Sequence, residues 1–440
     1  MDSQNKQTMT DSTISQQEMP RGSIAIAALS TIVEWYDFTL YLYLATLVSR
    51  VFFGGGTAGL ITTLGGFAIA YLLRPLGALI LAQIGDRFGR RRMLLLSVAI
   101  MTITMLATAL LPTYAQIGSA AGWLIFLLRC VMGFSVGGEY TGVVAYLLEG
   151  APQTRRGLIA SLASAASEIG GLLAVGVSSL TVTCLSAASL DTWGWRIPFL
   201  VGAGLAASVW IARSTMQESS DFQRQQANGT VPLHPLRHIL ARHRLGVMRS
   251  FAISALGSIT YYVGITYVPT FLTATRTLGE SQSLWLSTIA AVAVVIVTPL
   301  TGALSDRLGR KPVLVFLTGC SAILPIIMFH LMARESYLQV LFGAIVLACL
   351  AGAVSAVGAV ATAEQFPGEG RLSGLALGAT LATAIFGGAT PYVAQILTDR
   401  TGSPLVPGVM IALVALCVFP VLITLSETSP RSALSMAKIP

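Results

Sequence analysis

The sequence predicts an all-α membrane protein whose twelve transmembrane helices form two similar six-helix bundles. Of its 440 residues, 54% are hydrophobic and only 10% are charged, whereas a soluble globular domain carries about 25% charged residues. Apolar runs of about 20 residues, the length that spans a bilayer, recur along the chain. A loop motif that begins at Gly85 returns, half the chain length later, at Ser305. This duplication indicates two halves with the same fold.

The apolar runs define the expected membrane spans and, between them, the organisation of the chain. The spans are residues 22–48, 59–84, 93–111, 121–146, 157–182, 194–213, 248–275, 284–304, 313–333, 338–363, 371–397 and 405–426. We expect a disordered tail (1–21), a first bundle (22–213), a linker (214–247), a second bundle (248–426) and a second tail (427–440). The linker is polar and long enough to let two rigid bundles rock against each other.

The two loop motifs are Gly85-Asp86-Arg87-Phe88-Gly89-Arg90 and Ser305-Asp306-Arg307-Leu308-Gly309-Arg310. An acid, a glycine turn and several arginines cannot lie in hydrocarbon, so each motif is expected in a short loop at the membrane surface. There the charged residues would cap helix ends and form ion pairs between the bundles that hold the outward-open state. A second repeated pattern supports the duplication: an acid is followed by an arginine at Glu149 and Arg155, and again at Glu364 and Arg371.

The net charge of +8 is distributed unevenly over the predicted loops. Both motifs and the linker fall on one side of the membrane, and only Arg50, Arg276, Arg334 and Arg400 fall in loops on the other. Because positive loops remain in the cytoplasm, we expect both termini there. The chain lacks the interleaved aromatic and basic residues that nucleic-acid stacking needs, so a nucleic-acid partner is not expected.

Several stretches resemble one protein family. The motif at Gly85 resembles the signature loop of the major facilitator superfamily. The stretches Val33-Glu34-Trp35-Tyr36-Asp37-Phe38, Leu73-Arg74-Pro75-Leu76-Gly77, Gly133–Tyr140 and Trp193–Phe199 are similar to its metabolite:proton symporter branch. The resemblance implies the major facilitator fold in the bacterial inner membrane, without enzymatic activity.

The resemblance also implies a reaction. We expect a monomeric symporter that imports a small organic acid, such as citrate, with protons, by alternating access. The stretch Ala382–Pro391 is similar to the citrate and tricarballylate carriers in particular. The alternative is a proton-coupled proline or betaine symporter. A membrane enzyme would need a nucleophile with a base or a metal triad, and a sensor would need a signalling domain; neither is recognisable.

Acidic residues within the first predicted helix are candidates for proton coupling, because charges inside a bilayer are costly and usually functional. Glu34 and Asp37 lie on one face of this helix, and Tyr41 continues that face as a candidate substrate ligand. Burial favours the neutral form of a carboxyl group, as a reversible proton carrier requires. The alternative is that one of them merely neutralises an arginine.

Arg74 and Arg196 are the candidate ligands for a substrate carboxylate. Arg74 lies within the second span, where either Asp37 or a substrate could be its anion, and the resemblance implies a position in the cavity. Arg196, between tryptophans at the outer start of the sixth span, would bind a carboxylate or anchor the membrane interface.

Arg129 and Glu139 share the fourth span, about 15 Å apart along its axis. The resemblance implies a role in proton transfer or gating for Arg129, and we expect a role in coupling or gating for Glu139 as well. A structural ion pair is the alternative for both residues. Glu168, on a polar face with Ser161 and Ser164, should point at the cavity or at the eighth span and contribute to substrate binding.

In the second half the predicted cavity face is aromatic and uncharged, with Tyr261, Tyr262 and Thr383 as substrate ligands. Rings can bind a quaternary ammonium, while hydroxyl groups can bind carboxylates; core packing is the alternative for each residue. No metal or other cofactor is expected, because the five cysteines are scattered and His234 and His238 have no further ligand nearby.

Overall fold

The computed structural model describes residues 21–230, 235–268, 271–272, 277–278, 280–334 and 336–428. Every regular element within these ranges is a helix. Most of both predicted tails, together with His234 and Arg276, lies outside the described residues.

The first half of the chain contains long helices joined by short ones. Its elements are α2 (Arg21–Tyr43), α3 (Ala45–Phe53), α4 (Gly56–Leu72), α5 (Arg74–Phe88), α6 (Arg90–Ala109), α7 (Tyr114–Ile117), α8 (Ala120–Val136), α9 (Glu139–Gly150), η1 (Gln153–Arg155), α10 (Arg156–Cys184), α11 (Ala187–Ser189), η2 (Leu190–Gly194) and α12 (Arg196–Ser214).

Two short linker helices lead into the second half, which repeats the pattern. The linker contains α13 (Ser220–Ala227) and α14 (Pro235–Arg242). The second half contains α15 (Arg244–Tyr261), η3 (Tyr262–Thr266), α17 (Glu280–Leu308), α18 (Arg310–Met332), α19 (Tyr337–Ala363), α20 (Arg371–Leu375), η4 (Ala376–Thr380), α21 (Leu381–Thr383), η5 (Ala384–Gly388), α22 (Thr390–Thr401) and α23 (Val406–Ile423).

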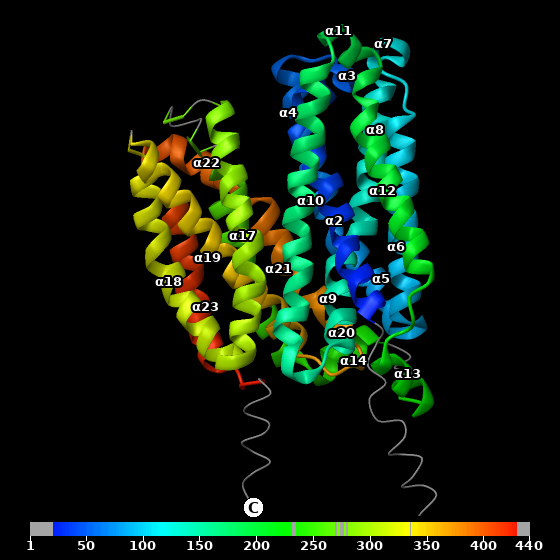
Figure 1. The fold of residues 1–440 in the computed structure, drawn as a ribbon, viewed down its shortest axis with the longest axis vertical. Helices are drawn as coiled ribbons and strands as arrows, with labels where there is room; N and C mark the ends of the chain where they lie inside the picture. Colours follow the sequence, from blue (N-terminus) through cyan, green and yellow to red (C-terminus); the bar gives the residue numbers. More distant parts are fainter. Residues whose placement is uncertain are drawn as a thin grey trace, which may run out of the picture.

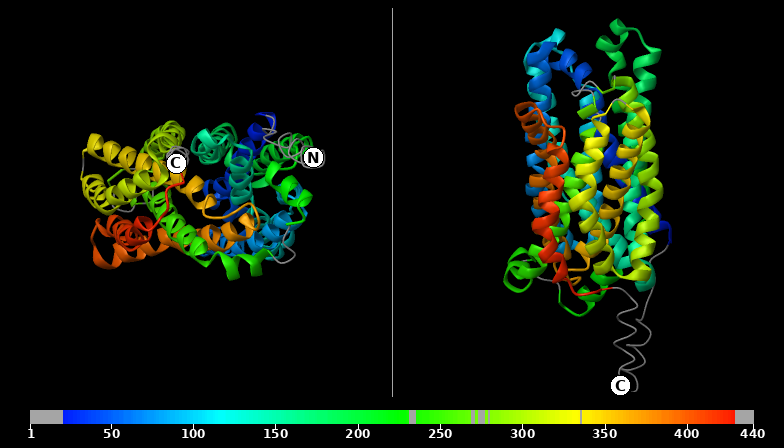
Figure 2. Two further views of the ribbon diagram at one scale, coloured as in Figure 1. Left: turned by 90° about the horizontal axis from the view of Figure 1, so that it is seen from below. Right: turned by 90° about the vertical axis from the view of Figure 1, so that its left-hand side faces the viewer.

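The long helices run roughly parallel, in two groups that lie side by side (Figures 1 and 2). Helices α17, α18, α19, α22 and α23 lie in one group, and α2, α6, α8, α10 and α12 lie in the other. Helices α10 and α17 pack against each other at the boundary. The linker helices and α20 lie at one end, which we call the motif end because Asp86 of the first loop motif contacts α20 there.

Nine helices within the described residues are long and apolar enough to cross a membrane. They correspond to nine of the twelve expected spans, and the first, seventh and eleventh spans are missing from this set. The first contains two carboxylates, Glu34 and Asp37, in α2. The other two are interrupted by π-helical turns, η3 in the seventh and η4 and η5 in the eleventh. Such turns are frequent at functional sites.

Apolar side chains are divided between the interior and the outer faces. One buried cluster crosses both halves at the motif end and includes Leu81, Leu147, Phe366 and Leu372. Separate clusters fill the first half and the second half. Large apolar side chains such as Trp123, Phe316 and Leu338 are exposed on the outside, as contact with lipid requires.

Glycines allow α4 and α5 to lie directly against α8, because helices in a membrane associate closely through small residues. A Cβ atom on Gly133 would lie 2.2 Å from the Ala70 carbonyl oxygen, and one on Gly137 would lie 2.0 Å from that of Arg74. A Cβ on Gly77 would lie 1.9 Å from the carbonyl oxygen of Phe134. The close crossing therefore depends on the absence of side chains at these positions.

Gly77→Ala should destabilise the protein by about 1–3 kcal/mol or more, because the new methyl group meets rigid backbone rather than a movable side chain. Thermal unfolding of the purified protein, followed by tryptophan fluorescence, should show a lower Tm. Gly204→Ala in α12 is the matched control, because a Cβ there meets nothing within 4 Å. Equal Tm values for the two variants would contradict the packing argument.

Candidate functional site

A cavity of about 160 Å³ lies between the two halves. The first half contributes α2, α4, α5, α8, α9 and α10, and the second contributes α15, η3, α19, α20, η4, α21 and η5. Five of the predicted site residues line it: Glu34, Arg74, Tyr261, Tyr262 and Thr383. The sequence did not single out Trp35, Tyr71, Tyr140 or Ser355 as ligands, although they line it too.

Arg74 forms a buried ion pair with Glu34, not with Asp37, at 2.9 Å between Nη2 and Oε1. It is the first residue of α5, directly after the break between α4 and α5. Pro75 cannot donate a hydrogen bond to the Tyr71 carbonyl four residues earlier, which favours a break here. The guanidinium also lies 4.8 Å from the centre of the Tyr71 ring. The break thus brings the arginine, its counter-ion and an aromatic face together at the cavity wall.

Three buried polar atoms on the cavity wall have no hydrogen-bond partner within the described residues. They are Glu34 Oε2, Trp35 Nε1 and Thr362 Oγ1. Buried polar groups without partners are rare in proteins because each carries an uncompensated desolvation cost. One acceptor, one N–H donor and one hydroxyl group on residues of the cavity wall are therefore without a partner among the described residues.

Five aromatic side chains form a closed ring in which each contacts the next. The ring runs Phe38, Trp35, Tyr261, Tyr262, Tyr71 and back to Phe38, with centroid separations of 5.5, 5.4, 5.5, 6.1 and 5.6 Å. The Tyr71 and Tyr262 hydroxyl oxygens lie 2.5 Å apart. Because Tyr261 and Tyr262 belong to the second half, this aromatic ring joins the two halves.

Asp37 pairs with Arg129, at 2.8 and 3.3 Å, one layer behind the cavity. Both side chains are buried, and the Tyr41 ring centre lies 5.3 Å from the guanidinium carbon. A second, smaller hollow of about 30 Å³ touches both ion pairs, Asp37–Arg129 and Glu34–Arg74. Tyr41 lies beside the Arg129 guanidinium and lines neither cavity, so it is not placed as the substrate ligand that the sequence predicted.

The other predicted ligands lie outside the cavity. Glu139 forms a buried ion pair with Arg213, which is the contact that the structural alternative predicted; its role in coupling or gating stays a prediction. Arg196 donates to the Thr192 and Leu111 carbonyl oxygens at 2.8 and 3.1 Å and lies over the Trp195 ring, as an anchor would. Glu168 is buried and does not line the cavity. The preceding residue, Ser167, lines the cavity instead of Glu168.

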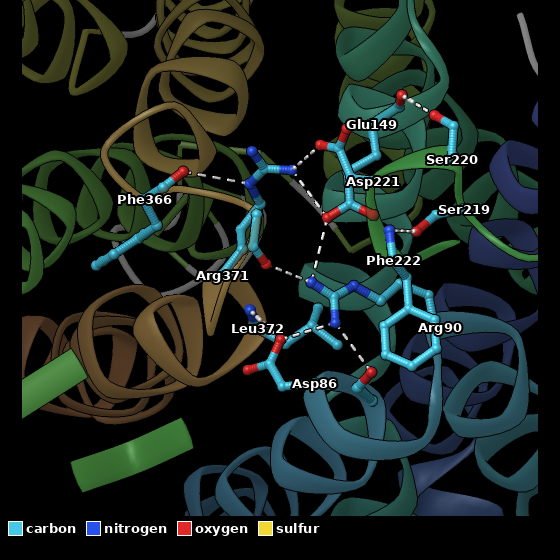
Figure 3. Close-up of polar contacts among 12 residues, drawn as sticks. Asp86, Arg90, Glu149, Ser219, Ser220, Asp221, Phe222, Phe366, Arg371 and Leu372 are labelled. Carbon is cyan, nitrogen blue, oxygen red and sulfur yellow. Dashed lines mark hydrogen bonds and ion pairs between the residues drawn. The ribbon is translucent and has the colours of Figure 1, made fainter. Parts of the chain in front are cut away.

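At the motif end the first loop motif holds the halves together (Figure 3). The Asp86 carboxylate accepts hydrogen bonds from the backbone N–H groups of Leu372 and Ser373, at 3.3 and 2.8 Å. Arg90 donates to the Gly368 carbonyl oxygen at 2.7 Å. A Cβ on Gly85 would lie 2.2 Å from Leu372 Cδ1, so this glycine permits the contact.

The second motif makes the corresponding contact in the opposite direction. Asp306 accepts hydrogen bonds from the backbone N–H groups of Gly157 and Leu158, at 2.8 and 2.9 Å. The carboxylates of both motifs therefore bind the N-terminus of a helix in the other half, where the helix dipole favours an anion. Arg307 is exposed.

The ion pairs of Asp86, Arg90, Asp306 and Arg310 stay within their own halves, which corrects the predicted pairs between bundles. Arg90 contacts Asp86 and Glu149, and Arg310 contacts Asp306 and Glu364. Among the described residues, the ion pair that crosses between the halves is Arg371–Glu149, at 2.8 Å, and Arg371 also contacts Asp221 of the linker at 3.4 Å. Each motif aspartate therefore contacts the other half through backbone N–H groups at a helix N-terminus, where an arginine of that half had been expected.

Two further glutamates cap the helices that follow the motifs. Glu218 accepts from the Arg90 and Arg91 amides at 2.9 and 3.2 Å, and Glu427 accepts from the Arg310 and Lys311 amides at 2.9 and 3.0 Å. Sequence reasoning missed both, because a cap contributed from more than a hundred residues away leaves no local pattern. Glu149 and Arg371 could have been found from the sequence, because each belongs to the acid-then-arginine pattern that recurs in the two halves.

Comparisons with known proteins identify the family. Residues 23–232 match the family model "Sugar (and other) transporter", and residues 267–438 match "Major Facilitator Superfamily". The ectoine/proline transporter of Corynebacterium glutamicum is 30% identical over 94% of this chain and 85% of its own length. The alpha-ketoglutarate permease of Escherichia coli is 33% identical (85% and 87%), and the citrate-proton symporter of Klebsiella pneumoniae is 30% identical (90% and 89%).

Among solved structures, a proton:xylose symporter bound to 6-bromo-6-deoxy-D-glucose superposes with a TM-score of 0.76 at 20% identity, covering 93% of this chain and 96% of that one. This similarity establishes the fold. The predicted family, fold class and absence of enzymatic activity are confirmed. The chain belongs to the major facilitator superfamily, a family of multi-pass membrane transporters.

Proposed function

We propose that the chain is a proton-coupled symporter for a small solute that carries a carboxylate group. The observation that carries the proposal is the cavity between the halves, whose wall holds an arginine, a carboxylate and unpartnered polar atoms. Residues from both halves contact the cavity, so a solute bound there would sense the relative position of the halves. Alternating access then follows from rocking of one half against the other.

The geometry favours a zwitterionic solute such as proline or glycine betaine. Among the described residues, the cavity wall carries one arginine, Arg74, and its counter-ion Glu34. A carboxylate of the solute would replace Glu34 at Arg74, and Glu34 would then face the positive group. Four rings of the aromatic ring, Trp35, Tyr71, Tyr261 and Tyr262, line the same cavity and suit a quaternary ammonium by cation–π contact.

Organic acids such as citrate or 2-oxoglutarate are the second candidate, and they are the substrates that the sequence favoured. Relatives named as a citrate-proton symporter and an alpha-ketoglutarate permease support them. A tricarboxylate, however, would need more than one cation, and Arg129 does not line the cavity. The cavity therefore supports the zwitterion better.

Uptake into proteoliposomes with an acidic exterior tests both candidates. Labelled glycine betaine and labelled citrate are offered separately, with unlabelled proline, 2-oxoglutarate and tricarballylate as competitors. Accumulation of betaine that proline blocks supports the zwitterion, whereas accumulation of citrate that the acids block supports the second candidate. If uptake of either solute does not depend on the pH gradient, proton coupling is refuted.

Asp37 is the proposed main proton site, because it is buried with Arg129 and touches the hollow that also reaches Glu34. Protonation of Asp37 would release Arg129, and deprotonation would restore the ion pair. Asp37→Asn should therefore abolish gradient-driven accumulation and retain exchange of labelled for unlabelled solute, because asparagine resembles the protonated acid. Asp191→Asn, at an exposed ion pair with Arg50, should behave as the wild type. Normal accumulation by Asp37→Asn would exclude this role.

The excess of positive loops supports a cytoplasmic motif end, with both termini on that side. In this orientation the described state is closed towards the cytoplasm. We also propose that the transporter works as a monomer in the bacterial inner membrane and that the proton gradient supplies the energy without a cofactor.

A further inference from the structure

The wall of the cavity between the halves is electrically neutral in the described part of the chain. Its charged residues there are Glu34 and Arg74, which pair with each other at 2.9 Å. Both are buried, with 2% and 9% of the residue exposed. The other lining residues are apolar or carry neutral hydroxyl or indole groups. A solute that binds here therefore enters a site in which each charge already has its counter-charge.

Glu34 depends on Arg74 for its positive counter-charge, because the arginines of the surrounding helices α3, α8 and α12 are engaged elsewhere. Their partners are Asp191 for Arg50, Asp37 for Arg129, Glu139 of α9 for Arg213, and two backbone carbonyl groups for Arg196. Helix α10 also packs against α2, and its Glu168 lines neither the cavity nor the smaller hollow. The titratable hydroxyl groups on the cavity wall are those of Tyr71, Tyr140, Tyr261 and Tyr262.

A solute carboxylate bound at Arg74 would take this counter-charge away from Glu34. The Oε2 atom of Glu34 has no hydrogen-bond partner among the described residues even while the ion pair is intact. Without Arg74 the carboxylate would be a buried anion with nothing to compensate it, which is costly. Two compensations remain: a positive group on the solute itself, or a proton on Glu34. The charge of the solute therefore selects the protonation state of this residue.

We propose that Glu34 matches the charge of the cavity to the charge of the solute. It stays ionised opposite the positive group of a zwitterion, and it binds a proton when the solute is an anion without such a group. This proposal rests on the carboxylate symport proposed above. It assigns Glu34 a role in specificity that is separate from the proton on Asp37.

The proton on Glu34 moves across the membrane together with the anion. It adds to a carboxylate oxygen of Glu34 from water on the side where the solute enters. It returns to water on the side where the solute leaves, because alternating access opens the cavity to the two sides in turn. An anion is therefore carried with one proton more than a zwitterion of the same shape.

Glycine betaine and tert-butylacetate are a matched pair of probes for this difference. Both join a carboxylate, through one CH₂ group, to an atom that bears three methyl groups. That atom is a positive nitrogen in betaine and a neutral carbon in tert-butylacetate. If the wild type binds proline rather than betaine, cyclopentanecarboxylate is the corresponding carbon analogue. Any effect of Asp37 applies to both members of a pair and cancels in their comparison.

Calorimetric titration of the purified protein in buffers of different ionisation enthalpy measures both the affinity and the protons taken up. The range is about pH 6 to 8.5, where the probe carboxylates stay ionised. Binding of tert-butylacetate should take up one proton more than binding of betaine. The dissociation constant of tert-butylacetate, divided by that of betaine, should rise about tenfold for each pH unit over which Glu34 titrates.

Glu34→Gln resembles the protonated acid and should abolish the difference in proton uptake between the two probes. Asp191→Asn, at the exposed ion pair with Arg50, is the control and should keep it. An unchanged difference in Glu34→Gln would overturn the proposal, and so would failure of tert-butylacetate to bind this variant. If Glu34→Gln does not fold, the wild type alone decides, because equal proton uptake with both probes contradicts the proposal.

Failure of the proposed function gives a different result. A wild type that binds none of betaine, proline, citrate and 2-oxoglutarate refutes the function itself. A wild type that binds an acid but no zwitterion is tested with that acid, whose own titration cancels between the wild type and Glu34→Gln. The variant should then take up one proton fewer. Equal uptake by the two proteins would overturn the role of Glu34 and leave the symport function intact.

Discussion

Arg74→Ala should reduce solute uptake by about thirtyfold or more. Removing one member of a buried, hydrogen-bonded charge pair costs about 2–5 kcal/mol, and each 1.4 kcal/mol or so is tenfold in affinity. Arg74 is the arginine on the cavity wall, held by Glu34 at 2.9 Å. Its removal takes away the proposed carboxylate ligand. Initial uptake rates and equilibrium binding of the labelled solute measure the effect.

Two further variants separate binding from folding. Glu34→Gln frees Arg74 from its counter-ion and should retain or strengthen binding of a carboxylate. Glu34→Gln combined with Arg74→Gln leaves no unpaired charge and should fold normally but not bind. Arg50→Ala, at an exposed ion pair with Asp191, is the matched arginine control. Binding by the neutral double variant would show that Arg74 is not the carboxylate ligand.

Glu149→Gln should open the motif end. The Glu149 carboxylate accepts from Arg371 of the second half at 2.8 Å and from Arg90 of the first at 3.3 Å. The amide would leave these buried guanidinium groups without that counter-charge, at a cost of about 3–5 kcal/mol in the closed state. The open state lets water solvate both groups. The equilibrium should therefore shift towards opening by about a hundredfold or more.

Cysteine labelling measures this shift. Ser373→Cys, in a background whose five native cysteines are replaced by alanine, gives a thiol at a residue that is 0% exposed in the closed contact with Asp86. Maleimide should label it slowly in this background and much faster with Glu149→Gln. Asp191→Asn, which removes an exposed carboxylate far from the contact, should not change the rate. Equal labelling in all three proteins would mean that Glu149 does not hold the halves together.

The sequence predicted most of the fold because hydrocarbon imposes strict rules on a chain. Only helices of a certain length satisfy the backbone in a bilayer, so hydropathy alone located nine spans that the structure has as long helices. The duplicated motif predicted two related halves. The same rules singled out the charged residues whose burial in a bilayer is costly. Of these, Glu34, Asp37, Arg74 and Arg129 all lie at or directly behind the cavity.

What the sequence alone determined, then, was the fold, the family and the set of charged residues to examine. The tertiary structure decided how those charges pair: Glu34 with Arg74, Asp37 with Arg129, and Glu139 with Arg213. It also decided that Arg371 and Glu149, not the motif residues, form the ion pair across the halves. Hydropathy fixes only how far along a helix axis a residue lies. The rotation of each helix and its neighbours follow from close packing at residues such as Gly77 and Gly137, and these contacts join segments far apart in the chain.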